Sequence, residues 1–372
     1  MSRSPERDEL HTTQAESHTA AGAAPRDDAT DSSSSQQNSP RYAPRSRELP
    51  AQIRRFAIWA GVLYGVVAQL AVRTGFDEAK AAFAVMSFTF VFILPLCLGF
   101  LTIYLDELSP GSRGGWKRWA FLPWVTITLC LFTSLLVGWE GTICVVMAAP
   151  VYLPLASLGG VIAGLLQRRR ERALVLLAPL IVMPLELNGW PLPDERREVI
   201  TEISVAASPA EIWPEVTQVR RIEEEQTGFF YRMGFPKPIE ATLSHEGVGG
   251  VREARFERGL TFYETVTEWV PEQKIRFTIR AAPDQVPLTT LDPHVVPGGL
   301  FFEALEGSYE LLPEEAPGRT KIRLKSRYRL STHFNAYASL WGDWLMNDIQ
   351  MNILRVLARR VERGRRAELP VN

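Results

Sequence analysis

A change in composition near residue 190 constrains this chain more than any other feature. Before it lie five long apolar runs, at 56–72, 81–105, 119–139, 142–166 and 173–190. Their lengths approach the roughly 20 residues that an apolar helix needs to cross a hydrocarbon core of about 30 Å. From Arg197 onward, apolar and polar side chains alternate as in a water-soluble sheet. The pattern predicts an N-terminal α-helical transmembrane bundle that carries one soluble domain.

The fifth apolar run differs from the first four. It is shorter and contains Pro179, Pro184 and Glu186, and both proline and charge are unfavourable in a lipid-facing helix. It either spans the membrane or forms a re-entrant or interfacial segment. We therefore expect four or five helices over residues 51–192 and a soluble domain over 194–365.

Basic residues indicate the orientation. They cluster before the first run and in the second and fourth loops: Arg41, Arg45, Arg47, Arg54, Arg55, Arg113, Lys117, Arg118, Arg168, Arg169, Arg170 and Arg172. The apolar runs predict an integral membrane protein, and the positive-inside rule predicts a cytoplasmic N-terminus. The soluble domain is extracytoplasmic if the fifth run spans the membrane and cytoplasmic if it does not.

The net charge argues against nucleic acid as a partner, and the composition of residues 1–50 predicts the state of the N-terminal tail. The net charge of −1 and the 22% of charged residues give no reason to expect nucleic acid. Residues 1–50 contain few large apolar side chains, namely Met1, Leu10, Tyr42 and Leu49. Such a segment buries too little surface to offset its conformational entropy, so we predict a disordered tail.

The soluble domain is predicted from its periodicity. Period-two alternation indicates strands at 197–205, 239–246, 251–257, 261–270, 273–280, 301–312 and 319–331. Ser208, Pro209 and Glu211 have the spacing of a helix start with a capping box. A second short helical piece is expected at 219–225. Residues 336–363 form a long amphipathic helix that needs a sheet to cover its apolar face.

This order of elements is that of the helix-grip fold, and the sequence itself carries a resemblance. The runs ISVAASPAEIW at 203–213, MGFPKP at 233–238, GVGGVR at 247–252 and ETVTEW at 264–269 resemble the START-like, polyketide cyclase/dehydrase superfamily (SRPBCC), in a membrane-anchored bacterial branch of unknown function. The resemblance implies an α+β domain in which an antiparallel sheet wraps round the C-terminal helix. It also implies a cavity for an apolar ligand.

Strand parity suggests which side chains face that cavity. Arg252 and Glu264 both occupy inward positions and can meet across the hairpin that turns at Gly259. A charge pair at a dry wall would orient a polar headgroup; the alternative is a structural ion pair. We expect Phe256, Tyr328, Trp341 and Trp344 to line the cavity as well, unless they are ordinary core residues. Asp343 and Asp348 are expected to face solvent.

Candidate catalytic groups are few. His294 lies in a long connection at 283–299, which would suit a lid, and an enzyme of this kind would use Glu264, His294 and Arg252. The histidines His245, His294 and His333 lack a metal-ligand spacing, so no metal and no cofactor are predicted.

One strand carries a row of cations on a single face: Lys321, Arg323, Lys325, Arg327 and Arg329. Glutamates on neighbouring strands, Glu198, Glu202, Glu306 and Glu310, can pair with these cations on a solvated outer face. Attraction to anionic lipid is the alternative.

Three functions remain compatible with the sequence. The leading hypothesis is a membrane-tethered module that binds a lipid or another hydrophobic small molecule in a helix-grip cavity. The first alternative is a polyketide cyclase/aromatase-like enzyme that acts on an apolar substrate. The second is a membrane protein-interaction or envelope-stress module.

Overall fold

The computed structural model describes residues 48–75, 83–108, 114–166, 170–189, 191–281 and 297–368. Residues 46–372 form one compact unit. The predicted disordered tail lies outside the described residues, apart from its last three positions, and so does His294.

The N-terminal half is helical. Its elements are α1 (Glu48–Gly75), the π-helix η2 (Thr89–Ile93), α3 (Leu94–Glu107), α4 (Trp116–Leu136), α5 (Thr142–Leu165), the 3-10 helix η3 (Arg170–Leu177) and α6 (Ala178–Gly189). Four helical stretches are long and apolar enough to cross a membrane, and they are Ala51–Thr74, Thr89–Glu107, Trp116–Leu136 and Thr142–Leu165. Leu174–Asn188 is a shorter apolar helix.

Glu186 in this shorter helix is buried and hydrogen-bonded. Its carboxylate accepts hydrogen bonds from the backbone N–H groups of Phe88 and Thr89, the latter at 2.9 Å. The same carboxylate lies 2.7 Å from Nδ1 of His333, which precedes the C-terminal helix. A buried carboxylate requires such partners because water cannot solvate it. Glu186 therefore joins the helical half to the C-terminal half.

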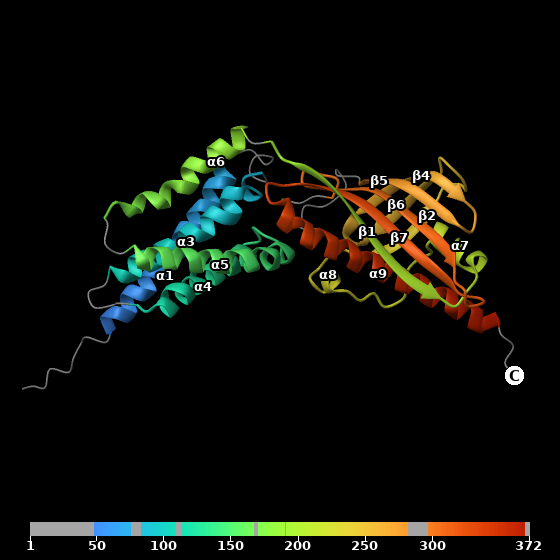
Figure 1. Cartoon of the computed structure of the whole chain (residues 1–372), viewed down its shortest axis with the longest axis horizontal. Helices are drawn as coiled ribbons and strands as arrows, with labels where there is room; N and C mark the ends of the chain where they lie inside the picture. Colours follow the sequence, from blue (N-terminus) through green and yellow to red (C-terminus); the bar gives the residue numbers. More distant parts are fainter. Residues whose placement is uncertain are drawn as a thin grey trace, which may run out of the picture. The chain divides into compact units, whose positions relative to one another are not determined.

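The C-terminal half is a seven-stranded antiparallel sheet that curves over one long helix, α9 (Asn335–Glu368) (Figure 1). The strands are β1 (Asp194–Val205), β2 (Pro238–Leu243), β3 (Val251–Phe256), β4 (Thr261–Val270), β5 (Lys274–Ala281), β6 (Phe302–Pro313) and β7 (Thr320–Ser331). Their order in the sheet is β1-β7-β6-β5-β4-β3-β2. This arrangement agrees with the expected helix-grip fold, and every predicted strand is present.

The sequence pattern explains the core. Along β1, Val205 is fully buried while Glu198 and Glu202 point outward, where they pair with β7. Leu354 and Leu357 of α9 pack against the inward side chains of the sheet in one cluster. Sheet and helix thus cover each other's apolar faces, which is the main source of stability in such a layer.

The short helices confirm one prediction and correct another. α7 (Pro209–Thr217) begins at the predicted capping box, in which the Ser208 backbone N–H donates to Glu211 at 2.6 Å. The piece predicted at 219–225 is not a helix. Val219 instead forms a bridge with Ala241 of β2, and backbone pairing there overrides the local pattern. The short helix is α8 (Phe229–Arg232).

The cations of β7 pair with acids, as one of the two interpretations predicts. Arg323 contacts Glu202 at 2.5 Å and Glu310 at 3.5 Å. Lys325 contacts Glu198 at 3.5 Å, and Arg327 contacts Glu306 at 3.2 Å. These side chains are partly exposed, so the row is an ordinary cross-strand charge pattern that needs no partner.

Candidate functional site

A cavity of ≈360 Å³ is the candidate site. In the C-terminal half, the wall of the cavity combines side chains of the strands with side chains of α9. Among them are Phe256, Phe262, Glu264, Phe277, Ile279, Tyr309, Leu324, Ser326, Trp341, Gln350 and Ile353. Residues of α1, α3, α4 and α5 also contribute to the lining, for example Gly65, Leu98, Leu131 and Ala148. Apolar side chains predominate, as in most small-molecule sites.

Arg252 and Glu264 meet at the wall of this cavity. They face each other in the register of β3 and β4, and Arg252 donates a hydrogen bond from a terminal guanidinium nitrogen to Oε2 of Glu264. Both side chains are buried, with exposures of 4% and 8%. The structure therefore brings together the two residues that strand parity placed on inward faces.

Burial and the charge of the partner shift the pKa of each member of this pair in opposite directions. Burial raises the pKa of Glu264, and Arg252 opposes that shift. For Arg252, burial acts to lower the pKa, but Glu264 and Tyr309 together outweigh burial and the pKa is raised. A charge is costly inside a protein unless an opposite charge compensates it. Each member of this pair thus depends on the other.

Phe277 and Tyr309 lie beside the ion pair, and we call the four side chains Arg252, Glu264, Phe277 and Tyr309 the polar corner. The guanidinium carbon of Arg252 lies 5.6 Å from the ring centroid of Phe277, within cation–π range. Phe277 faces Gly307 across β5 and β6, and a Cβ added to Gly307 would lie 2.4 Å from the ring. Glycine at 307 is thus what gives the ring its space. Burial raises the pKa of Tyr309, and the nearby charge of Arg252 opposes that shift.

A second polar spot lies elsewhere on the wall, and sequence reasoning missed it. Gln350 of α9 donates to Oγ of Ser326 on β7 at 2.8 Å, and it accepts from Thr201 of β1 at 2.6 Å. Gln350 is 2% exposed. A lone glutamine on the apolar face of a helix is the signal that could have indicated this buried network.

The aromatic residues expected in the cavity divide into two groups. Phe256 and Trp341 line it. Tyr328 is fully buried and packs against Gly342, while Trp344 is 42% exposed and stacks on Phe229 with ring centroids 4.5 Å apart. Neither Tyr328 nor Trp344 is among the described lining residues. Their environments are those of a core residue and of a surface aromatic cluster.

Asp343 and Asp348 are partly exposed, and both also hydrogen-bond to neighbouring elements. Asp343 accepts from Arg197 at 2.6 Å and from the Tyr328 hydroxyl at 2.6 Å. Asp348 accepts from the backbone N–H of Phe230 at 3.1 Å. Burial raises the pKa of Asp343, but these donors outweigh it and hold the pKa below its usual range. Both carboxylates anchor α9 to neighbouring elements.

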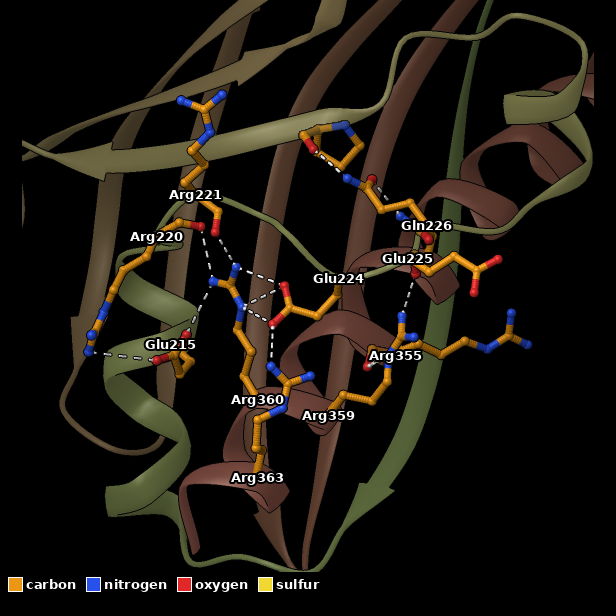
Figure 2. Close-up of polar contacts among 12 residues, drawn as sticks. Glu215, Arg220, Arg221, Glu224, Glu225, Gln226, Arg355, Arg359, Arg360 and Arg363 are labelled. Carbon is orange, nitrogen blue, oxygen red and sulfur yellow. Dashed lines mark hydrogen bonds and ion pairs between the residues drawn. The ribbon is translucent and has the colours of Figure 1, made fainter. Parts of the chain in front are cut away.

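The basic end of α9 is a second cluster of charges (Figure 2). Arg360 donates from Nε to both carboxylate oxygens of Glu224 at 3.1 Å. It also donates from Nη1 to the carbonyl of Arg220 at 3.0 Å and from Nη2 to the carbonyl of Arg221 at 2.6 Å. The carboxylate of Glu215 lies 3.6 Å away. Arg360 thus ties α9 to the segment before α8. Its guanidinium is fully engaged, so this cluster is structural.

His245 and His333, the two histidines within the described ranges, lie on separate elements. His245 is close to Ser244 in an exposed turn, and His333 contacts Glu186. Across the described part of the chain, no group of three or more His, Cys, Asp or Glu side chains has an arrangement that could hold a metal ion.

Solved structures match a part of this chain at low similarity. The aromatase/cyclase ZhuI from Streptomyces sp. R1128 is 14% identical with a TM-score of 0.31, and the match covers 48% of this chain and 100% of ZhuI. Norcoclaurine synthase from Thalictrum flavum is 11% identical with a TM-score of 0.30, over 46% of this chain and 96% of the enzyme.

A third structure, DynU16 from the dynemicin biosynthetic locus, is 19% identical with a TM-score of 0.26. That match covers 45% of this chain and 48% of DynU16, so the chain spans about half of its length. No family model and no curated relative matches. At these TM-scores and identities the comparisons carry no argument, and the function must be argued from the site.

Proposed function

We propose that this protein is a membrane-tethered module that binds a hydrophobic small molecule in the helix-grip cavity. The observation that carries the proposal is the cavity wall, in which aromatic and aliphatic side chains surround the buried carboxylate of Glu264. An apolar wall supplies affinity by removing ligand surface from water, and one polar group fixes the orientation of the ligand.

The tether follows from the four apolar helices, each long enough to cross a membrane. Helix residues such as Leu131 and Ala148 contribute to the same cavity lining as the strands. A ligand dissolved in the bilayer would then meet the cavity without crossing water. Tethering also raises the effective concentration of the cavity near the membrane. A lipid or a lipid-soluble metabolite is the class of ligand that fits this route.

Native mass spectrometry of the full chain, extracted from its own membranes, tests the proposal. We expect a stoichiometric apolar ligand. Ala304 lines the cavity, so Ala304→Phe should fill it and remove the ligand. Thr278→Phe is the matched control, because Thr278 is exposed on β5. A wild-type protein that is empty when isolated, and that takes up no apolar molecule when reconstituted, would refute the proposal.

Catalysis is the second candidate, and one observation favours it. Glu264 is a buried carboxylate with a raised pKa on the wall of a cavity, as general acids and bases often are. Turnover of a bound apolar molecule that disappears in Glu264→Gln, while binding persists, would establish an enzyme. Unchanged recovery of the bound molecule after prolonged incubation would favour the binding module.

A further inference from the structure

The charged side chains that line the described part of the cavity are all acidic. Among the described residues its charged side chains are Glu140 and Glu264, and none is a lysine, an arginine or a histidine. The other polar side chains of the lining, such as Gln350 and Ser326, are neutral, and these two hydrogen-bond to each other. A ligand that carries a negative charge would find no cation on the described wall to compensate it.

Arg252 does not change this conclusion, because it lies behind the wall. It is 4% exposed and is absent from the described lining, whereas Glu264 and Phe277 belong to it. Its guanidinium is bound to Oε2 of Glu264 and lies against the ring of Phe277. The charge of Arg252 thus serves to hold the carboxylate in place, and a ligand in the cavity meets the carboxylate first.

The polar corner offers one acceptor and one donor. Arg252 occupies Oε2 of Glu264, which leaves Oε1 as the oxygen that can accept a hydrogen bond from a ligand. Tyr309 also lines the cavity. Its phenol hydroxyl can donate a hydrogen bond to an acceptor on a ligand. A hydroxyl group complements both positions at once, since it donates and accepts.

We infer that the cavity selects an uncharged apolar molecule bearing a hydroxyl group and excludes apolar carboxylates and phosphates. This inference rests on the proposed binding function and names the class of its ligand. Discrimination comes from attraction and repulsion together: an alcohol satisfies Glu264 and Tyr309, whereas an anion places like charges side by side.

Three probes with one skeleton test the inference: 2-methylnaphthalene, 2-naphthylmethanol and 2-naphthoate. Each is titrated at pH 7 into the full chain in nanodiscs, and binding to empty nanodiscs is subtracted. We expect the alcohol to bind more tightly than the carboxylate by at least about tenfold, the effect of one hydrogen bond to a charged group. The hydrocarbon should lie between them.

Two variants test whether Arg252 and Glu264 cause the difference in affinity among the three probes. In Glu264→Gln the charge of Arg252 is no longer compensated, so 2-naphthoate should gain affinity relative to the alcohol. The double substitution Arg252→Met, Glu264→Leu should bind all three probes within a few-fold, since an apolar replacement of a buried pair is often tolerated. Glu306→Gln on the outer face is the matched control and should keep the wild-type order.

Outcomes separate this inference from the function on which it rests. If 2-naphthoate binds as tightly as the alcohol, or if the hydrocarbon binds most tightly, the inferred ligand class is wrong and the binding function stands. If none of the three probes binds, the inferred ligand class is refuted, and the native mass spectrum of the chain extracted from its membranes then decides whether the binding function fails as well.

Discussion

The inner and outer faces of one sheet both carry ion pairs of arginine and glutamate, but the two pairs differ in their exposure to solvent. On the outer face Arg327 pairs with Glu306, and both side chains are more than a third exposed. On the inner face Arg252 pairs with Glu264, and both are buried. Water solvates the outer pair whether or not it forms, whereas the inner pair has no other source of solvation. The inner pair is therefore the informative one for function, although the outer row is more conspicuous in the sequence.

Removing one partner of the inner pair should have the largest effect. Glu264→Ala leaves the Arg252 charge buried without its counterion, and we expect the free energy of unfolding to fall by about 3–5 kcal/mol. Urea denaturation of the full chain in detergent, followed by tryptophan fluorescence, measures this change. The double substitution Arg252→Met, Glu264→Leu should recover most of the loss. If the single and double variants are equally unstable, packing rather than charge governs this corner.

Disruption of the Arg360 cluster should cause the second-largest fall in the free energy of unfolding. Its guanidinium is largely buried and donates to Glu224 and to two carbonyls. Arg360→Met should lower the free energy of unfolding by roughly 2 kcal/mol, the scale of hydrogen bonds to a charged group. Hydrogen exchange should show the loosening at the end of α9 and in the segment before α8. Arg355→Met is the control, because Arg355 is exposed on the same helix and points away from the cluster in Figure 2. Equal exchange in both variants would contradict the structural role.

Asp343 should make stability depend on pH. Its folded pKa is lowered, because the donors Arg197 and Tyr328 outweigh the effect of burial. Its contribution is therefore complete above the unfolded pKa of about 3.9 and is lost as pH falls through the lower folded value. Asp343→Asn should be less stable than wild type at pH 6, and the gap should narrow below about pH 4. Denaturation curves from pH 6 to pH 3 test this, and a constant gap would exclude the carboxylate as the cause.

The outer face should respond least. Arg327→Gln removes a partly exposed ion pair with Glu306. Such pairs contribute little because water and salt screen them. We expect a denaturation midpoint within the error of the wild-type value, at low and at high salt. A clear loss of stability at low salt only would show that the β7 row acts as a network.

Local pattern was sufficient for most of the fold. The strands of the sheet, the capping box at Ser208 and the long C-terminal helix follow from periodicity and end signals, because each depends on neighbours in sequence. The helix expected at 219–225 fails for the opposite reason, since the partner of Val219 is Ala241. In the site, parity placed Arg252 and Glu264 together because two paired strands share one register.

The sequence by itself determined the two-part organisation, the inward positions of the ion pair and the pairing of the outer charges, all of which depend on periods of a few residues. Only the tertiary structure decided that Glu264 lines the cavity while Arg252 lies behind it, that Tyr328 is core, and that Asp343 and Gln350 join α9 to the sheet. These features depend on how a long helix crosses a curved sheet. Asp343 then meets Arg197, 146 positions away, and Gln350 meets Thr201, 149 positions away, and no local pattern encodes such contacts.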